Sequence, residues 1–414
     1  MSLIVYAIPL FLGLMLLEIV VARAIKAPVY RFHDAVTSIQ IGFVSELFRS
    51  VTKLVSVVVY ATLVQQVAAL TWDTRHPAVW VVAFFLYNFF YYWAHRCGHE
   101  INLLWASHVV HHSSEEFNLS TALRQSWTNQ VFYWIFYLPM AILGIPVEVF
   151  VVTALASAVY QFWVHTRLID RMGWMEHVFV TPSHHRVHHG RNAYCIDRNY
   201  GGTLIVWDRL FHTFAAERRG EPVVYGTLVP IRSWSPVWAN LKNYLTMASD
   251  AVATPGWRQK LLLVFAPPGT VAVAGSAVVE PVPLSAAPFD TPAPRLQKIY
   301  GALATLGVLA FVLDLLLHSP QLDMGLRLAL TLAAALSTVP LAWVFEGRKD
   351  ALALEAVRCT LILAPAAAGI WFHAVPPVWR ACAAAALVLH ICLLAGLART
   401  TPAPHSARAS EERA

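Results

Sequence analysis

The sequence has few charged residues: Asp, Glu, Lys and Arg make up 13% of its 414 residues, whereas 57% are hydrophobic. Soluble globular domains carry about 25% charged residues, so this composition excludes an ordinary soluble domain and predicts an integral membrane protein. The first apolar run lacks a basic residue before it and a small-x-small cleavage site after it, and both are features of signal peptides. We therefore expect this run to be retained as a membrane helix.

Cysteine is also scarce, and its spacing excludes a disulfide framework. The five cysteines contain no C-x-x-C pair; they are Cys97, Cys195, Cys359, Cys382 and Cys392. This pattern is compatible with a reduced site that faces the cytoplasm. The net charge of +6 is explained by basic residues that face anionic lipid headgroups, so we expect no nucleic-acid partner.

Long apolar runs are the most frequent feature of the chain. Several approach the roughly 20 residues needed to cross about 30 Å of hydrocarbon. The predicted spans lie near residues 3–22, 51–70, 78–94, 299–317, 327–345, 351–372 and 378–397. The apolar stretch 131–163 is interrupted by Gly144 and Pro146, which predicts a helical hairpin. The expected fold class is therefore all-α, a polytopic membrane protein with about nine transmembrane or membrane-embedded helices.

Charge and composition predict the topology and the domain boundaries. Basic residues follow the first apolar run, which by the positive-inside rule places its end in the cytoplasm. Counting the predicted spans from there places both histidine-bearing segments, residues 95–130 and 164–298, on the cytoplasmic side of the membrane. Residues 251–298 are rich in Pro and Ala and predict an irregular linker. We expect 1–250 to form a membrane-embedded catalytic domain, 299–398 a four-helix membrane domain and 399–414 a disordered tail.

Histidine is unevenly distributed, because twelve of the eighteen histidines lie between His95 and His212. In "HRCGH" (95–99) two histidines are four residues apart and share one face of a helix. In "HVVHH" (108–112) the spacing i, i+3, i+4 also places three on one face, and "HHRVHH" (184–189) ends in the same pattern. His165 stands alone at the end of the predicted hairpin. This repetition predicts a metal site, since imidazole is the commonest metal ligand.

The number of ligands predicts two metal ions. Nine histidines belong to this set: His95, His99, His108, His111, His112, His165, His185, His188 and His189. One zinc ion takes three or four protein ligands, so nine are too many for a single ion. Zinc, copper, iron and nickel all accept imidazole, and the spacing does not choose among them. His184 stays undecided, and the other histidines are expected to be hydrogen-bonded or solvated.

The order of these motifs resembles the fatty acid hydroxylase and sterol desaturase superfamily of membrane di-iron enzymes. Within it, three strings are very similar to alkylglycerol monooxygenases: "HEINLLWASHVVHHSSEEFNLSTALRQS", "QFWVHT" and "HHRVHHGRNAYCIDRNYGGTLIVWDRLFHTF". The resemblance covers roughly residues 85–215. It implies that the nine histidines ligate two Fe ions, which use O2 to hydroxylate the carbon next to the ether bond of an alkylglycerol. The product would then separate into an aldehyde and a glycerol derivative, with tetrahydrobiopterin or another reductant as the electron donor.

Polar residues beside the histidine motifs are candidates for supporting roles. Glu100 directly follows the first motif and is expected to accept a hydrogen bond from an imidazole N–H, which would fix its tautomer. Asn118 and Arg124 belong to a polar stripe that would orient a lipid headgroup or a pterin. Glu100, Asn118 and Arg124 are therefore the candidate catalytic residues. Glu115 and Glu116 are expected to lie on a solvated face.

Two alternatives use the same motifs. A sterol, fatty acyl or carotenoid hydroxylase or desaturase would share the histidine spacing, and only the longer strings favour an ether lipid. A histidine-rich metal transporter would carry its histidines inside the spans, whereas these lie at span ends and in loops. The chain end "TPAPHSARASEERA" is typical of a bacterial protein, so we expect a bacterial inner membrane with the site facing the cytoplasm.

Overall fold

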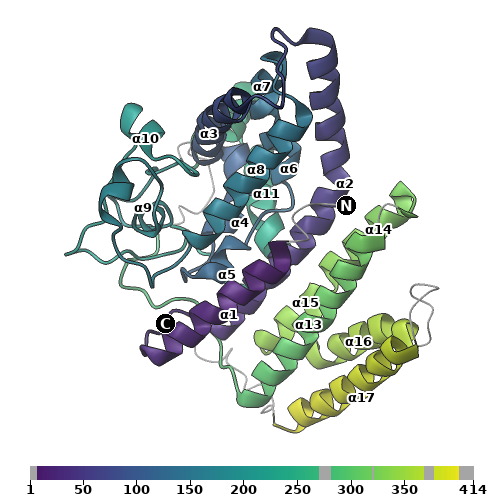
Figure 1. The fold of residues 1–414 in the computed structure, drawn as a ribbon. Coiled ribbons are helices and arrows are strands. Elements are labelled where there is room, and N and C mark those ends of the chain that lie inside the picture. Colours follow the sequence, from purple (N-terminus) through teal and green to yellow (C-terminus); the bar gives the residue numbers. More distant parts are fainter. Residues whose placement is uncertain (1–6, 270–280, 319–320, 368–376, 401–414) are drawn as a thin grey trace.

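Every regular element of the computed structural model is a helix (Figure 1). The structure describes residues 7–269, 281–318, 321–367 and 377–400. Within these ranges no β-strand occurs, and the extended backbone forms two isolated bridges, Phe179 with Leu204 and Gly190 with Tyr225. The expected all-α fold class is therefore confirmed.

The first part of the chain supplies most of the helices. They are α1 (Ile8–Ala24), α2 (Phe32–Val67), α3 (Pro77–Glu100), α4 (Asn102–His112), α5 (Leu119–Ala122), α6 (Asn129–Phe132), the 3-10 helix η2 (Tyr133–Tyr137), α7 (Leu138–Ile142), α8 (Val147–Trp163), the 3-10 helix η3 (Gly173–His177), α9 (Pro182–His188), α10 (Val206–Leu210), α11 (Pro236–Ala253) and α12 (Trp257–Phe265). Helix α3 begins on Pro77, where a missing N–H costs nothing. The His76 side chain caps it by accepting a hydrogen bond from the Ala78 N–H.

The second part is an assembly of apolar helices: α13 (Arg295–His318), α14 (Met324–Leu336), α15 (Thr338–Phe345), α16 (Ala351–Ala367) and α17 (Pro377–Thr400). They follow the four predicted spans, except that the second is divided at Ser337. The end of the predicted span 351–372 and nearly all of the predicted tail 399–414 lie outside the described residues.

The number of helices that could cross a membrane is smaller than expected. Among the described residues, four segments are long and apolar enough: α2, α3, α13, and α14 together with α15. Helix α1 has 17 residues and is only about 25 Å long. The first arm of the predicted hairpin is divided into α6, η2 and α7. Pro139 stands in the first turn of α7, because a proline is tolerated at the start of a helix but interrupts one that continues through it. The predicted number of about nine transmembrane or membrane-embedded helices is therefore not confirmed.

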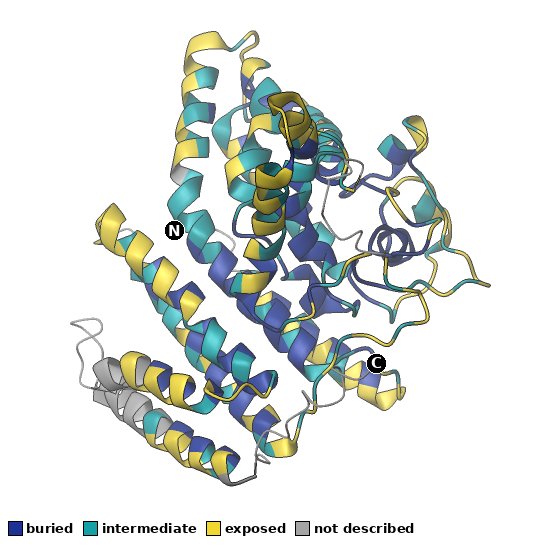
Figure 2. Ribbon diagram, turned by 180° about the vertical axis from the view of Figure 1, so that it is seen from behind, coloured by how far each residue is buried: buried dark blue, intermediate teal, exposed yellow. Residues whose placement is uncertain are grey.

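Helix α2 joins the two parts of the molecule. Its first half is largely buried, whereas much of its second half is half-buried or exposed (Figure 2). Val36 packs in one apolar cluster with Tyr300 of α13 and Leu341 of α15, and the Gln40 amide donates to Thr305 Oγ1 of α13 at 3.0 Å. The C-terminal helices thus share a core with the first part. The expected irregular linker 251–298 contains helix α12.

Candidate metal centre

All nine predicted histidines come together in two buried groups. In each group, one ring nitrogen per residue lies within 4.8 Å of those of the other members. The first group consists of His95, His99, His108, His112 and His188, and the second of His111, His165, His185 and His189. His184 belongs to neither group. Its ring packs edge-on against Phe214.

Three short helical segments and one helix end bring these side chains together. His95 and His99 lie in the last two turns of α3, and the next motif occupies the end of α4. The third motif lies on α9 and its C-cap residue, His189. His165 follows the end of α8 by two residues. The helical spacing expected for the motifs is therefore confirmed, and each of the three helices contributes ligand nitrogens to one or both groups.

Backbone carbonyls fix the orientation of four imidazoles. The Nδ1 atoms of these rings lie 2.7 to 3.2 Å from a carbonyl oxygen. The pairs are His95 with Tyr200, His111 with Arg124, His165 with Gln161, and His188 with Arg198. A carbonyl can only accept, so each Nδ1 carries the proton and each Nε2 presents a lone pair. This tautomer is the one that binds a metal through Nε2.

The Nε2 atoms then face one another at distances that suit a shared cation. His111 and His165 approach with their Nε2 atoms 3.3 Å apart, although both atoms carry lone pairs. Two facing lone pairs repel unless a cation lies between them. Metal–imidazole bonds are about 2.1 Å long, so two nitrogens that would share one ion must lie within about 4.2 Å of each other, and this pair meets that limit. Buried His99 Nε2 and His188 Nε2 have no hydrogen-bond partner among the described residues, so the donor set fits two metal ions.

The buried environment keeps the imidazoles neutral. Six histidines outside the membrane-spanning segments have a lowered pKa, mainly because they are buried and also because neighbouring imidazoles repel their charged form. They are His108, His111, His112, His185, His188 and His189. Burial also lowers the pKa of His165 to about 4. Neutral imidazole is the form that binds metal, so at neutral pH these ligands need no deprotonation.

Glu100 does not take the role that the sequence suggested. Its carboxylate accepts from Arg96 Nε at 2.9 Å, one helical turn earlier, and it makes no hydrogen bond to an imidazole within the described residues. The carboxylate beside an imidazole belongs to Asp197, whose Oδ1 lies 3.5 Å from His99 Nδ1. The loop after the third motif folds back over α3 and brings Asp197 there, which local spacing could not reveal.

Asn118 and Arg124 lie in structural contacts. Asn118 forms the N-cap of α5 in a capping box with Thr121, and its amide donates to the Val29 carbonyl at 2.7 Å. Arg124 is buried, and its guanidinium donates to Ser113 Oγ at 3.1 Å. Its contact with the metal centre is through its backbone carbonyl, which accepts from His111. The two residues therefore shape the segment that follows His111, and neither side chain makes a hydrogen bond to a histidine of either group within the described residues.

Glu115 and Glu116 are not solvated, contrary to expectation. Glu116 forms ion pairs with Arg31 and Arg167, and its side chain is 11% exposed. Glu115 accepts from the backbone N–H of Phe289 at 2.5 Å. Both carboxylates therefore tie the segment after α4 to distant parts of the chain.

Two other acids support the surroundings of the metal centre. Asp208 accepts hydrogen bonds from the backbone N–H groups of Tyr200 and Gly201 at 2.7 Å, and so holds the carbonyl that orients His95. Glu18 is buried in α1 and accepts from Tyr30, from the Leu119 N–H and from Thr166, which follows His165. A single acid within an apolar run was the only signal for Glu18.

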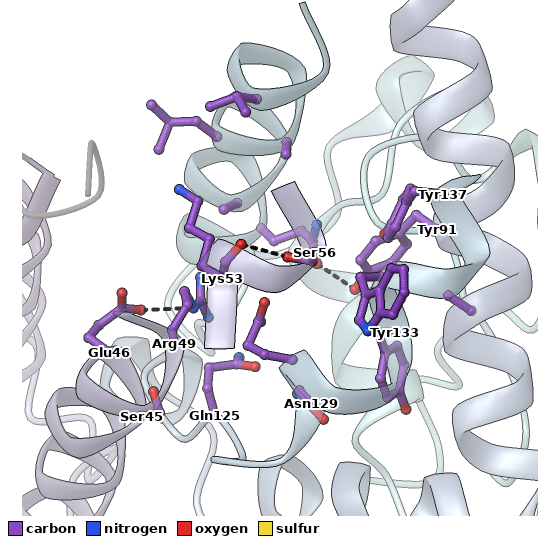
Figure 3. A pocket seen from close by; sticks show the side chains of 18 of the residues that line it. Ser45, Glu46, Arg49, Lys53, Ser56, Tyr91, Gln125, Asn129, Tyr133 and Tyr137 are labelled. Carbon is purple, nitrogen blue, oxygen red and sulfur yellow. Dashed lines mark hydrogen bonds and ion pairs between the residues drawn. The ribbon is translucent and has the colours of Figure 1, made fainter. Parts of the chain in front are cut away.

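A cavity of about 390 Å³ opens beside the two groups. It is lined by His95 and His108 of the first group and by His111 of the second. From there it extends between α2, α3 and α8 along apolar and aromatic side chains, among them Tyr87 and Phe150. Figure 3 shows Tyr91, Tyr133 and Tyr137 on one wall of this cavity. An elongated apolar ligand could thus reach both histidine groups along the apolar walls of this cavity.

Comparison with known proteins agrees with this geometry. Residues 80–213 match the model of the fatty acid hydroxylase family, and this range contains all nine histidines. The chain is 38% identical over 366 residues to the alkylglycerol monooxygenase of Homo sapiens. The matched region covers 86% of this chain and 81% of the human protein. The alkylglycerol monooxygenase of Xenopus tropicalis is 38% identical over 365 residues, which cover 85% of this chain and 79% of that protein.

A more distant relative matches a smaller part. The ornithine lipid hydroxylase of Rhizobium tropici is 30% identical over 146 residues, 34% of this chain and 44% of that protein. No solved structure matches the chain.

Proposed function

The chain belongs to the alkylglycerol monooxygenase family and is thus an integral membrane monooxygenase that acts on a lipid with O2. From this family membership we propose that it hydroxylates the carbon next to the ether bond of alkylglycerols. The observation that carries this proposal is the cavity, which reaches both histidine groups through apolar walls. The relatives that match most of the chain are alkylglycerol monooxygenases, which favours an ether lipid over a sterol, a carotenoid or a simple acyl chain.

The proposed metals are two iron ions, one held by each histidine group. When bound, they would supply the oxidant derived from O2 that breaks the C–H bond. The carbonyls of Tyr200, Arg124, Gln161 and Arg198 hold four of the imidazoles in their metal-binding tautomer. Asp197 lies close enough to orient His99. A set of neutral imidazoles also avoids the burial of carboxylate charge, which would need its own partners.

The chemistry of the product follows from the position that is hydroxylated. One oxygen atom of O2 enters the C–H bond beside the ether oxygen, the other leaves as water, and a reductant supplies two electrons. The resulting hemiacetal separates into a fatty aldehyde and a free glycerol hydroxyl. The cavity walls bury the alkyl chain and limit access of water to the reacting carbon.

The electron donor and the orientation in the membrane are part of the proposal. We take tetrahydrobiopterin as the two-electron donor, and no nucleic acid takes part. Arg23 lies in the last turn of α1, and Lys26 and Arg31 follow this helix. These basic residues support a cytoplasmic location of the metal centre. The expectation of a bacterial inner membrane has no support in the alkylglycerol monooxygenase relatives, which come from animals.

The proposed function is tested with purified, iron-loaded protein. It is incubated with a 1-O-alkylglycerol, O2 and tetrahydrobiopterin, and the fatty aldehyde is measured by mass spectrometry. Replacing His111 or His188 with Ala should abolish aldehyde formation and lower the iron content. The control is His177→Ala, which removes an exposed histidine outside both groups and should change neither. Full activity with two irons in either His111→Ala or His188→Ala would refute the assignment of that ligand.

A further inference from the structure

Two basic side chains lie in the wall of the cavity, on a helix that could cross the membrane. Arg49 and Lys53 stand in the middle third of α2 and both line the cavity. Helix α2 is long and apolar enough to span a bilayer. Ionisable residues within such a helix are costly, and they usually mark a functional site when they face the protein interior.

These side chains form one face of α2 with an acid. Glu46, Arg49 and Lys53 are spaced i, i+3, i+7, which places them on the same side of the helix, and Figure 3 shows them together in the cavity. Arg49 Nε lies 3.4 Å from Glu46 Oε1. Lys53 has no acidic partner within 4.0 Å in the described ranges. The face therefore carries one excess positive charge, which an anionic ligand would balance.

The lining of the cavity changes character along its length. Beside the basic face it is polar, with Ser45, Gln125 and Asn129. Along α8 it is apolar, with Phe150 and Leu155 among its lining residues. The histidines of the metal centre also border it. A ligand that fills the cavity would thus meet a basic polar region, an oxidising centre and an apolar wall.

From this arrangement we propose that Arg49 and Lys53 bind a phosphate on the glycerol of the ether lipid, and so determine which lipids the enzyme accepts. This inference rests on the proposed function. In such a lipid, six bonds separate the phosphorus from the carbon next to the ether oxygen, and the alkyl chain continues from that carbon in the other direction. The phosphate would meet the basic face, the reacting carbon the metal centre, and the alkyl chain the wall formed by α8.

Binding to the purified full-length protein in a neutral detergent tests this site. The probes are radiolabelled 1-O-hexadecylglycerol and its 3-phosphate. The wild type should bind the phosphate at least about tenfold more tightly, as expected for charge-assisted hydrogen bonds. The Arg49→Gln/Lys53→Gln variant should lose this preference, and Arg49→Lys/Lys53→Arg should retain most of it. Equal binding of the two lipids by the wild type, or a preference that survives in the Gln variant, would overturn the proposal.

Two controls separate this site from other effects. Arg258→Gln/Lys260→Gln removes two basic residues of α12 that do not line the cavity and should keep the preference. Hexadecanoate should compete weakly with the phosphate lipid. Displacement by hexadecanoate at equal concentration would overturn the proposal by assigning the site to a fatty carboxylate.

Turnover distinguishes this inference from the function on which it rests. The ratio of kcat/KM for the phosphate lipid to that for the neutral lipid should fall at least about tenfold in Arg49→Gln/Lys53→Gln. Aldehyde formation from both lipids with equal kcat/KM in the wild type would overturn the phosphate site and support the proposed function. Charge-dependent binding without aldehyde from either lipid would refute the proposed function and support the phosphate site.

Discussion

Replacing Glu18 with Ala should destabilise the fold and lower the metal content, because this carboxylate connects α1 to two segments of the metal centre. It accepts three hydrogen bonds, from the Tyr30 hydroxyl at 2.5 Å, the Leu119 N–H at 2.8 Å and the Thr166 hydroxyl at 2.5 Å. A buried donor left without a partner costs about 1–3 kcal/mol. Two hydroxyls can reorient and recover part of that loss, so we expect a decrease of about 3 kcal/mol in the free energy of unfolding.

Thermal and denaturant unfolding in detergent would measure this decrease, and mass spectrometry of the purified protein would measure bound metal. Glu18→Gln keeps the shape of the side chain and one acceptor oxygen, so its loss should be about half as large. Glu148→Gln is the matched control, since Glu148 is an exposed acid on apolar helix α8, and it should lie within about 0.5 kcal/mol of the wild type. If Glu18→Ala were as stable as the control, the three contacts would not support the site.

Three other perturbations test the packing, the electrostatics and the metal. In Gly42→Ala the new Cβ would lie 2.5 Å from the Leu123 carbonyl oxygen, so denaturant unfolding should show a loss of about 1–3 kcal/mol of stability. The control is Gly307→Ala, where the new Cβ meets open space and should not destabilise the protein. Equal losses in the two variants would contradict this expectation. Burial raises the pKa of Asp208 from 3.8 to about 6, so the folded state binds a proton more tightly than the unfolded state. The free energy of unfolding of the wild type, relative to that of Asp208→Asn, should therefore fall by about 3 kcal/mol as the pH rises from 4 to 6. A difference that stays constant with pH would refute the shift. Removal of bound metal with a chelator should lower the Tm of the wild type. It should lower that of His188→Ala by less, since this variant keeps only the second histidine group intact. An unchanged wild-type Tm would argue against a stabilising metal.

The clustering of the nine histidines could be predicted from the sequence because its signals are local. His95 and His99 are one helical turn apart, and the spacing of the other two motifs likewise placed their histidines on one face of a helix. The orienting groups are backbone carbonyls, for example that of Tyr200. Any residue type could supply a carbonyl, so sequence offers no signal for it.

One contact within α3 and several contacts between distant segments explain where the structure differs from the predicted surroundings of the histidines. Glu100 lies next to His99 in sequence, but Arg96 is one turn away on the same helix face and binds the carboxylate. Asp197 reaches His99 across almost a hundred residues of chain. Glu116 was expected to be solvated, and its partners Arg31 and Arg167 come from both sides of the sequence. Periodicity describes single helices and contains no information on which loops fold back over them.

If Arg49 and Lys53 bind the lipid as proposed, α2 adds a part of the substrate site that lies outside the stretch carrying the nine histidines. Residues 80–213, which match the hydroxylase family, carry all nine histidines, whereas one side of the cavity is built by α2, which the C-terminal helices brace through Val36 and Gln40. Changes in α2 could therefore redirect the enzyme to another lipid without any change in the ligands. The apolar C-terminal helices, which lack a histidine group among their described residues, would influence specificity by holding that helix in place.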